Sequence, residues 1–356
     1  MTAFVPLREA GMSCGAKAAT LGRLLRAGFA VPDGFALPVG AGVGWERELR
    51  GVLETLGGSR FAVRSSALAE DGSETSFAGQ FRTTLNVSSD EVEVQVRRTA
   101  AAVDEARAYA AAFGRSVPRG IAVIVQRMLV PDAAGVAFTR DPISGRPAVV
   151  LEAVRGLGDR LVSGRARPER WRIAPGDGPR SAETPEVLSA EQAVTVSRVA
   201  TRAEGLLGGG QDLEWALTGS QVWALQARPI TSTPKSDRSP ACLPVMNAMT
   251  VASGTPASPG TARGVLRIVN GLDDFARFTP GDVLVCRATS PAWAPLLTRA
   301  AAVVTTRGGV LAHAAIIARE LRIPAVTDVT SAMDLPDDML VDVDGTTGTI
   351  TAQKAR

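Results

Sequence analysis

The segment 303–326, with the sequence VVTTRGGVLAHAAIIARELRIPAV, contains His313, the only histidine among the 356 residues of the chain. An apolar run at 300–304 has the composition of a buried strand, and the glycine pair Gly308–Gly309 interrupts it. Apolar residues then recur at helical spacing over 314–321, before a proline that ends the helix. The pattern therefore predicts a strand, a glycine turn and a helix, with His313 where the turn enters the helix.

This position gives the imidazole a particular chemical setting. The first backbone N–H groups of a helix have no partner within the helix and favour an anion. An imidazole beside them presents a nucleophilic nitrogen to a site suited to phosphate. A lone histidine is more often a core or capping residue, but the glycine pair and the sharply bounded strand, turn and helix favour a functional His313.

The segment resembles the phosphohistidine domain of the family of phosphoenolpyruvate synthase, pyruvate phosphate dikinase and rifampin phosphotransferase. The family pattern is a strand, then T-x-x-G-G-x-x-S-H-A-A-I-x-A-R-E and G-I-P-A-V. The chain matches it at Thr305, Gly308, Gly309, His313, Ala314, Ala315, Ile316, Ala318, Arg319, Glu320, Ile323, Pro324, Ala325 and Val326. It departs at Arg322, which replaces a glycine, and at Ala312, where the family carries a hydroxyl or thiol. Because that group would support the phosphorylated imidazole, we expect slower turnover than in relatives.

Composition limits the classes of protein. A chain of 356 residues is long enough for two or three domains, and 45% hydrophobic with 21% charged residues is ordinary for a soluble globular protein. No apolar run approaches the roughly 20 residues that span a bilayer, and no signal peptide opens the chain, so we expect no membrane association. Three cysteines without metal-ligand spacing suit a reducing cytoplasm. A net charge of +3, dispersed arginines and a single tyrosine argue against nucleic-acid binding.

A glycine-led amphipathic helix is expected from Gly15, with Lys17 in its first turn. The helix dipole disfavours a cation there, so either Lys17 is a structural lysine or its charge is directed at phosphate oxygens. This opening resembles the family's G-G-K-x-x-x-L…G-x-x-V-P-x-G-F start, with Ala16 in place of the second glycine. The resemblance implies that Lys17 binds the nucleotide phosphates.

The stretch 61–83 combines a short strand, ending in Arg64 and two serines, with a loop of small residues. A fork of donors followed by backbone N–H groups suits phosphate, although a surface turn with a solvated arginine has the same pattern. The string VRSSALAEDGSETSFAGQFRTTLNV closely resembles the family's V-R-S-S-A-x-x-E-D-x-x-x-x-S-F-A-G-x-x-x-T, which implies that Arg64, Gly79 and Thr83 contact ATP. Beyond it, a helix within 88–112 is expected to bury Val92, Val96, Ala100 and Val103.

Residues 121–128 have the pattern of a buried strand, and 135–139 form another. Gln126 and Met128 stand where ATP-grasp enzymes place the hinge that holds adenine. A polar residue within an apolar strand needs a partner, which either an adenine edge or a backbone group supplies. The resemblance favours adenine and implies that both residues bind ATP.

A β-hairpin is expected over 211–230, turning at Gly219–Ser220. Strand alternation lets Glu214, Gln226 and Arg228 converge on one site, where two oxygen ligands can hold Mg²⁺ and a guanidinium can bind phosphates. A solvated strand face is the alternative. The sequence resembles the family's D-x-E-W-A…L-x-x-L-Q-A-R-P-I-T. This implies that all three residues contact ATP, that Glu214 and Gln226 ligate Mg²⁺, and that Arg228 is catalytic.

A Ser/Pro-rich stretch at 231–244 reads as a linker. We expect an ATP-grasp nucleotide-binding domain at 1–230, with lobes at about 1–120 and 121–230, and a phosphohistidine domain at 245–356. The predicted fold class is α/β (α+β), with a two-lobed ATP-grasp domain followed by a swivelling β/β/α domain.

The resemblance implies an ATP-dependent phosphotransferase of the dikinase type that works through phosphohistidine at His313, uses ATP and Mg²⁺, and releases AMP and phosphate. We expect no counterpart of the larger relatives' acceptor domain, because the linker joins the two modules within about 20 residues. The sequence does not identify the acceptor; we expect a small molecule, with a partner protein or a second copy of the chain as a source for its site. Two other functions stay open: an ATP-dependent ligase that condenses an activated substrate, and a phosphohistidine relay to a partner protein. The remaining alternative is an inactive relative. The presence of a charged residue at every charged position of the ATP site argues against it.

Overall fold

The computed structural model describes residues 2–42, 44–67, 71–72, 75–76, 83–101, 120–162, 166–181, 184–230, 248–290, 293–310 and 312–353. The chain divides into two compact units. The first unit consists of Met1–Thr139, Arg155–Leu157 and Val187–Ile230, and the second of Arg140–Val154, Gly158–Glu186 and Thr231–Arg356. The expected linker at 231–244 lies outside the described residues, so the division into domains at 1–230 and 245–356 stays a prediction.

The first unit contains a five-stranded antiparallel sheet with the strand order β1-β2-β7-β3-β6. Its strands are β1 (Val5–Pro6), β2 (Gly34–Leu37), β3 (Arg60–Ala67), β6 (Thr83–Ser88) and β7 (Ile121–Arg127). Its helices are α1 (Gly15–Arg26), α2 (Glu46–Leu56) and α3 (Val92–Ala101), and a short hairpin pairs β4 (Asp71–Gly72) with β5 (Thr75–Ser76). The strand predicted at 121–128 and the helix predicted from Gly15 are confirmed.

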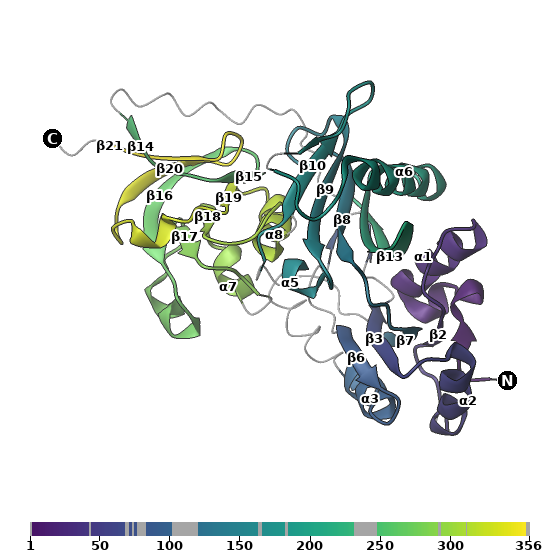
Figure 1. Ribbon diagram of the computed structural model, residues 1–356. Coiled ribbons are helices and arrows are strands. Elements are labelled where there is room, and N and C mark those ends of the chain that lie inside the picture. Colours follow the sequence, from purple (N-terminus) through teal and green to yellow (C-terminus); the bar gives the residue numbers. More distant parts are fainter. Residues whose placement is uncertain are drawn as a thin grey trace. The chain divides into compact units, whose positions relative to one another are not determined.

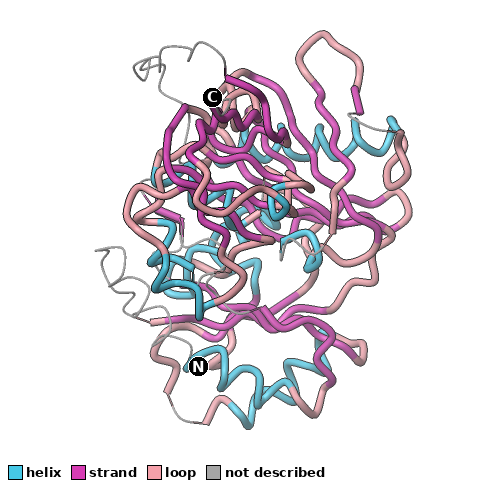
Figure 2. Tube along the Cα trace, turned by 90° about the vertical axis from the view of Figure 1, so that its left-hand side faces the viewer, coloured by secondary structure: helices cyan, strands magenta, loops and turns pink. Residues whose placement is uncertain are grey.

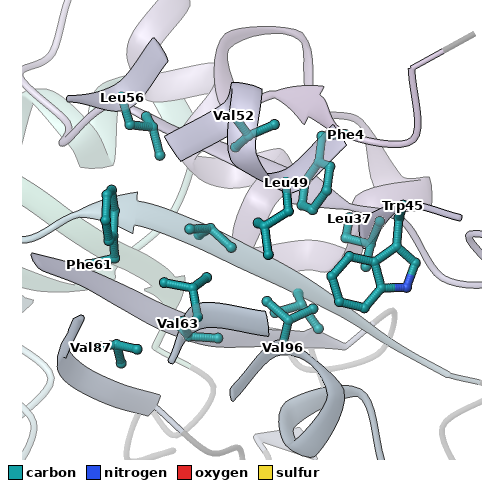
Figure 3. Packing of buried hydrophobic residues seen from close by; sticks show 13 residues of the cluster. Phe4, Leu37, Trp45, Leu49, Val52, Leu56, Phe61, Val63, Val87 and Val96 are labelled. Carbon is teal, nitrogen blue, oxygen red and sulfur yellow. The ribbon is translucent and has the colours of Figure 1, made fainter. Parts of the chain in front are cut away.

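Alternation along β3 directs apolar side chains to one face of this sheet and polar ones to the other. Phe61 and Val63, both 0% exposed, lie in one cluster with Leu49 and Val52 of α2 (Figure 3). The other members of this cluster are Phe4, Leu37, Trp45, Leu56, Val87, Val92, Val96, Val123 and Val125. Because Arg64 is the next residue after Val63 on the strand, its side chain belongs to the opposite face, away from the apolar cluster.

The first unit also contains three consecutive antiparallel strands, with β12 (Gln211–Thr218) between β8 (Ala133–Arg140) and β13 (Gln221–Pro229). The helix α6 (Ala190–Leu207) packs against β12 and β13, and it starts with a capping box formed by Ser189 and Gln192. The hairpin predicted to turn at Gly219–Ser220 is confirmed, because β12 ends at Thr218 and β13 starts at Gln221.

The second unit includes β9 (Pro147–Arg155) as far as Val154, and then α5 (Asp159–Val162), β10 (Glu169–Ile173) and β11 (Arg180–Ser181). The strand β10 pairs antiparallel with both β9 and β11. The residues of β9 from 148 to 154 are all buried. One of them, Glu152, is charged and 0% exposed, which is unusual for a carboxylate and requires compensating partners.

The rest of the second unit is an eight-stranded sheet with the order β14-β21-β20-β16-β17-β18-β19-β15. Its strands are β14 (Ala248–Ser253), β15 (Thr255–Ser258), β16 (Thr261–Ile268), β17 (Val283–Cys286), β18 (Ala302–Thr305), β19 (Ala325–Thr327), β20 (Leu340–Asp344) and β21 (Thr349–Gln353). The neighbours β16, β17, β18 and β19 run parallel, and the other pairs are antiparallel. The helices are α7 (Ala294–Leu297) and α8 (His313–Leu321).

The helix α8 packs against β15, β18 and β19 (Figure 1). The strand, turn and helix predicted around His313 are confirmed, since β18 is followed by the glycine turn and α8 starts at His313 itself. Apolar residues on the parallel strands and on the helix form the core here. Its most deeply buried members include Val283, Val285, Ala302, Val304, Val326, Ala315 and Ile317.

The chain contains both helices and strands (Figure 2), so the predicted mixed α/β class is confirmed. Within the described part of the chain, we find no helix whose length and hydrophobicity would let it span a bilayer.

Candidate active site

Arg64 lies at the centre of a polar cluster in the first unit. Its guanidinium Nη2 is 3.2 Å from Oε1 of Gln226 and 3.4 Å from Oε2 of Glu214, and Nη1 is 3.3 Å from Oε1 of Gln126. It also donates to the backbone oxygen of Leu225. Arg64 is 7% exposed, so its charge acts in surroundings with little water. The cluster joins three segments that the sequence analysis singled out separately.

The register of the hairpin explains why two carboxylates and their partners share a face. Glu214 is the cross-strand partner of Gln226, and Asp212 is the partner of Arg228, two positions along. Arg228 donates from Nε to Oδ2 of Asp212 over 2.7 Å. Residues two apart on a strand lie on the same face, so both pairs face one side of the hairpin. Asp212 was not among the predicted site residues, although its place opposite Arg228 could have indicated it.

The first turn of α1 is fixed against the end of β3. Lys17 is 4% exposed and donates from Nζ to the backbone oxygen of Ser65 over 3.1 Å, and Ser66 Oγ accepts from the Ala18 N–H at 3.1 Å. Gly15 has a φ of 83°, and a Cβ there would lie 2.2 Å from the Ser66 backbone oxygen. Glycine at this position therefore allows the close approach that brings Lys17 beside the residues following Arg64.

Three of the remaining predicted ATP contacts are described. Thr83, at the start of β6, is the cross-strand partner of Arg64 and is exposed. Gln126 is 2% exposed and donates from Nε2 to the backbone oxygen of Pro32 over 3.0 Å, so its amide already has a backbone partner as well as Arg64. Met128 follows the last residue of β7. Gly79 lies outside the described residues. The adenine-hinge role of Gln126 and Met128 stays a prediction.

His313 is the first residue of α8 in the second unit. Its N-cap is Ala312, whose methyl group cannot accept from the N–H groups of the first turn. The imidazole is 9% exposed, and burial lowers its pKa from 6.5 to about 4. Nε2 has no hydrogen-bond partner among the residues that the structure describes. The ring is therefore neutral near pH 7.

The other ring nitrogen has a partner that the sequence analysis did not identify. Thr289 Oγ1 lies 2.8 Å from Nδ1 of His313. Thr289 follows β17 and His313 follows β18, and these two strands are parallel neighbours. Because the carboxyl ends of parallel strands meet at one edge of a sheet, both side chains reach the same place. When Nδ1 carries the proton and donates to Thr289, Nε2 keeps the lone pair that a nucleophile needs.

Two of the predicted residues also fit a magnesium ion. Mg²⁺ prefers oxygen ligands and usually takes one or two carboxylates together with phosphate oxygens and waters. Oxygens of Glu214 and Gln226 lie within 3.4 and 3.2 Å of the same Arg64 nitrogen, so they face one place. In the part of the chain that the structure describes, no group of three or more His, Cys, Asp or Glu side chains could hold a metal. Phosphate oxygens and waters would complete the coordination.

Two family models match the chain. The model described as pyruvate phosphate dikinase, AMP/ATP-binding domain, matches residues 45–179. The model described as PEP-utilising enzyme, mobile domain, matches residues 278–348. Arg64 lies within the first match, and His313 lies within the second.

Relatives among curated proteins agree with these models. A probable phosphoenolpyruvate synthase of Archaeoglobus fulgidus is 35% identical over 322 residues, which cover 81% of this chain and 43% of that protein. A probable phosphoenolpyruvate synthase of Methanothermobacter thermautotrophicus is 33% identical over 320 residues, covering 81% and 46%. The phosphoenolpyruvate synthase of Aeropyrum pernix is 33% identical over 361 residues, covering 82% and 44%. The chain spans less than half the length of each of these relatives.

The fold, the polar cluster and the two matched models define a protein with a nucleotide-binding module and a mobile module that carries a histidine. The chain belongs to the family of phosphoenolpyruvate synthase and pyruvate phosphate dikinase. The resemblance drawn from the sequence is thereby confirmed.

Proposed function

We propose that the protein is an ATP-dependent phosphotransferase of the dikinase type, in which His313 carries the phosphoryl group to a small-molecule acceptor. The observation that carries this proposal is the state of the imidazole. It is buried and neutral near pH 7, with Nδ1 beside Thr289 and a buried Nε2 that has no hydrogen-bond partner among the described residues. A neutral imidazole at the start of a helix is suited to attack phosphorus and to hold the anion that results.

The first unit supplies the charges that such a reaction needs. Lys17, Arg64 and Arg228 are cations that can stabilise negative charge on the phosphates of ATP as the bond to the leaving group breaks. Glu214 and Gln226 would hold Mg²⁺, which when bound neutralises charge on the phosphates. Arg64 bridges both ligands, so it keeps the two oxygens together.

The reaction steps follow from the family. Nε2 of His313 forms a bond to the β-phosphorus of ATP, the bond from that phosphorus to the α-phosphate oxygen breaks, and AMP leaves. The pyrophosphorylated histidine then loses its terminal phosphate by transfer to water. An acceptor oxygen finally attacks the remaining phosphorus, and the electron pair of the N–P bond returns to Nε2.

The acceptor and its place of binding belong to the proposal. The matched relatives are named as synthases of phosphoenolpyruvate, a small molecule, and we propose a small-molecule acceptor here too. Separate modules at 1–230 and 245–356 would let one histidine visit ATP and the acceptor in turn. A partner protein or a second copy of the chain would supply further residues for the acceptor, and the protein would act in the cytoplasm.

Product analysis tests this function. The protein is incubated with Mg-ATP and a panel of candidate small metabolites, and the nucleotides and new phosphorylated compounds are identified by mass spectrometry. Release of AMP and phosphate together with one new phosphorylated metabolite is expected. ADP as the only nucleotide product would contradict the dikinase chemistry, and a condensed product would favour a ligase.

A further inference from the structure

The backbone of Val310 is held from both sides by buried side chains of opposite charge. Its N–H donates to Oε1 of Glu152 over 2.9 Å, and its C=O accepts from Nη1 of Arg319 at 2.8 Å. Glu152 is 0% exposed and Arg319 is 6% exposed. All three residues belong to the second unit. Val310 stands three residues before His313, so these contacts fix the turn that leads into the histidine.

The surroundings of Glu152 show that this contact is part of what makes its burial tolerable. Burial raises the pKa of Glu152, while Arg170, the Val310 N–H and Arg319 oppose that rise. Arg170 approaches Oε1 from Nη2 at 3.2 Å and from Nε at 3.4 Å. Oε1 thus accepts hydrogen bonds from both Arg170 and the Val310 N–H, whereas Oε2 has no hydrogen-bond partner among the described residues. Leaving a fully buried carboxylate without its hydrogen-bond donors costs free energy. The contact therefore stabilises both the position of Glu152 and the conformation of the turn.

Gly309 gives independent evidence that the two segments fit each other closely. A Cβ at this position would lie 2.2 Å from Oε1 of Glu152 and 2.6 Å from its Cδ. The backbone of Gly309 is outside the left-handed region, so its conformation does not require glycine. Gly308, in contrast, has a φ of 110° and is glycine for conformational reasons. At position 309 the nearest obstacle to a side chain is therefore the carboxylate of Glu152.

From these contacts we infer that Glu152 is a positioning residue for phosphoryl transfer to His313, a role that rests on the function proposed above. It acts through the Val310 N–H, which fixes the turn and with it the direction of the imidazole. Glu152 lies in the match to the nucleotide-binding model, and Val310 lies in the match to the mobile-domain model. The contact therefore orients His313 only while these two segments touch, and the histidine is free to reorient once they separate.

The kinetic test compares two substitutions of Glu152. Glu152→Ala should slow labelling of His313 by ATP about 10- to 100-fold, the usual effect of losing a charge-assisted hydrogen bond that orients a reacting group. The KM for ATP should stay unchanged, because Glu152 does not belong to the Arg64 cluster. Glu152→Gln keeps an oxygen acceptor for Val310 and should restore labelling to within about 10-fold of the wild type. A rise in the KM for ATP with an unchanged maximal rate would overturn the role.

A double-mutant cycle separates this contact from general damage. Gly309→Ala should slow labelling because its methyl group displaces the carboxylate, and adding it to Glu152→Ala should cause little further loss. Gly308→Ala is the matched control, since its strain comes from its own backbone and from the Ala312 Cβ, 2.7 Å from a Cβ at position 308, and not from Glu152. Its effect should multiply with that of Glu152→Ala. If Gly309→Ala multiplied in the same way, the fit between position 309 and Glu152 would be irrelevant to the histidine.

Amide exchange of Val310 provides a readout that does not require catalysis. In protein labelled with ¹⁵N-valine and kept without ATP, the Val310 N–H should exchange at least about 10-fold faster in Glu152→Ala than in the wild type or in Glu152→Gln. Thermal unfolding of each variant checks that it is folded. If the wild type failed to label on His313 while Val310 exchange responded as expected, the proposed function would be wrong, but the hydrogen bond between Glu152 and Val310 would be supported. Unchanged exchange in a folded Glu152→Ala protein would overturn the inference itself.

Discussion

Thr289 Oγ1 lies 2.8 Å from Nδ1 of His313, although 24 residues separate them in the chain. The contact arises because the two residues follow adjacent parallel strands, β17 and β18. It places the hydroxyl that supports the imidazole on a neighbouring loop. The residue immediately before the histidine, Ala312, has no such group. Whether this arrangement turns over more slowly than that of relatives stays a prediction.

Replacing Thr289 tests the role of this contact. Thr289→Val keeps the shape of the side chain but removes the hydroxyl, which leaves Nδ1 buried without its partner. The favoured tautomer is lost, so labelling of His313 should slow about 10-fold or more, in keeping with the cost of an unsatisfied buried group. Thr289→Ser keeps the hydroxyl and should stay close to the wild type. Equal rates for the serine and valine variants, measured by single-turnover labelling, would rule out a role for the hydroxyl.

The low pKa of His313 predicts how stability depends on pH. Between pH 6.5 and about 4 the unfolded chain binds a proton at this residue and the folded protein does not. The free energy of unfolding should therefore fall as the pH is lowered, by about 1.4 kcal/mol per pH unit from this residue alone. Urea unfolding from pH 7 to pH 4.5 measures this change. His313→Asn should lack the contribution, and other titrating groups cancel when the two proteins are compared. Parallel curves would mean that His313 is not buried as a neutral ring.

The polar cluster of the first unit predicts large effects on chemistry. Glu214→Ala and Arg228→Ala should each lower the rate of labelling by at least about 100-fold, because each removes a preorganised charge at the transition state. Arg263→Ala is a suitable control, since Arg263 forms an exposed ion pair with Asp342 at 2.7 Å in the second unit. A near-normal rate of labelling in either variant would mean that ATP binds elsewhere in the protein.

The proposed movement of the histidine module can be tested by crosslinking. Arg167 and Asp328 form a 3.1 Å ion pair within the second unit, and Asp328 belongs to the mobile-domain match. Cysteines at these two positions, joined by a short bismaleimide in a Cys242→Ser background, would hold the two segments together. Labelling of His313 should survive, while turnover of the acceptor found by product analysis should be lost.

The control crosslink uses Arg263 and Asp342, which are cross-strand partners on β16 and β20, inside the same sheet. This link joins two strands that need not move relative to each other, so turnover of the acceptor should continue. If the link between positions 167 and 328 also left turnover at the normal rate, the acceptor would bind beside ATP and no movement of the module would be required.

Local patterns in the sequence predicted the elements that depend on neighbours in the chain. The turn at Gly219–Ser220 and the start of α8 at the histidine follow from residue types within a few positions. The prediction of which residues α3 buries was only partly correct. Ala100 is exposed and Thr99 is 0% exposed instead, because the helical repeat of 3.6 brings the seventh residue after Val92 to the buried face and carries the eighth away from it. Val103 lies outside the described residues.

Contacts between distant segments could not be predicted in this way. Glu152 and Val310 are 158 residues apart, and nothing in either local sequence identifies the other. Thr289 required the parallel order of β17 and β18 to be known first. The hairpin is the intermediate case, since its turn fixes the register that pairs Glu214 with Gln226 and Asp212 with Arg228.

The most direct test of the account is the site and chemistry of labelling. The protein is incubated with Mg²⁺ and ATP labelled with ³²P in the β position, and the protein-bound label is then exposed to acid and to base. The account predicts a label that is labile in acid, stable in base and absent from His313→Ala. Because the chain has a single histidine, no second residue of this kind can replace it. A label that persisted in His313→Ala would show that another residue is the nucleophile and would contradict the account.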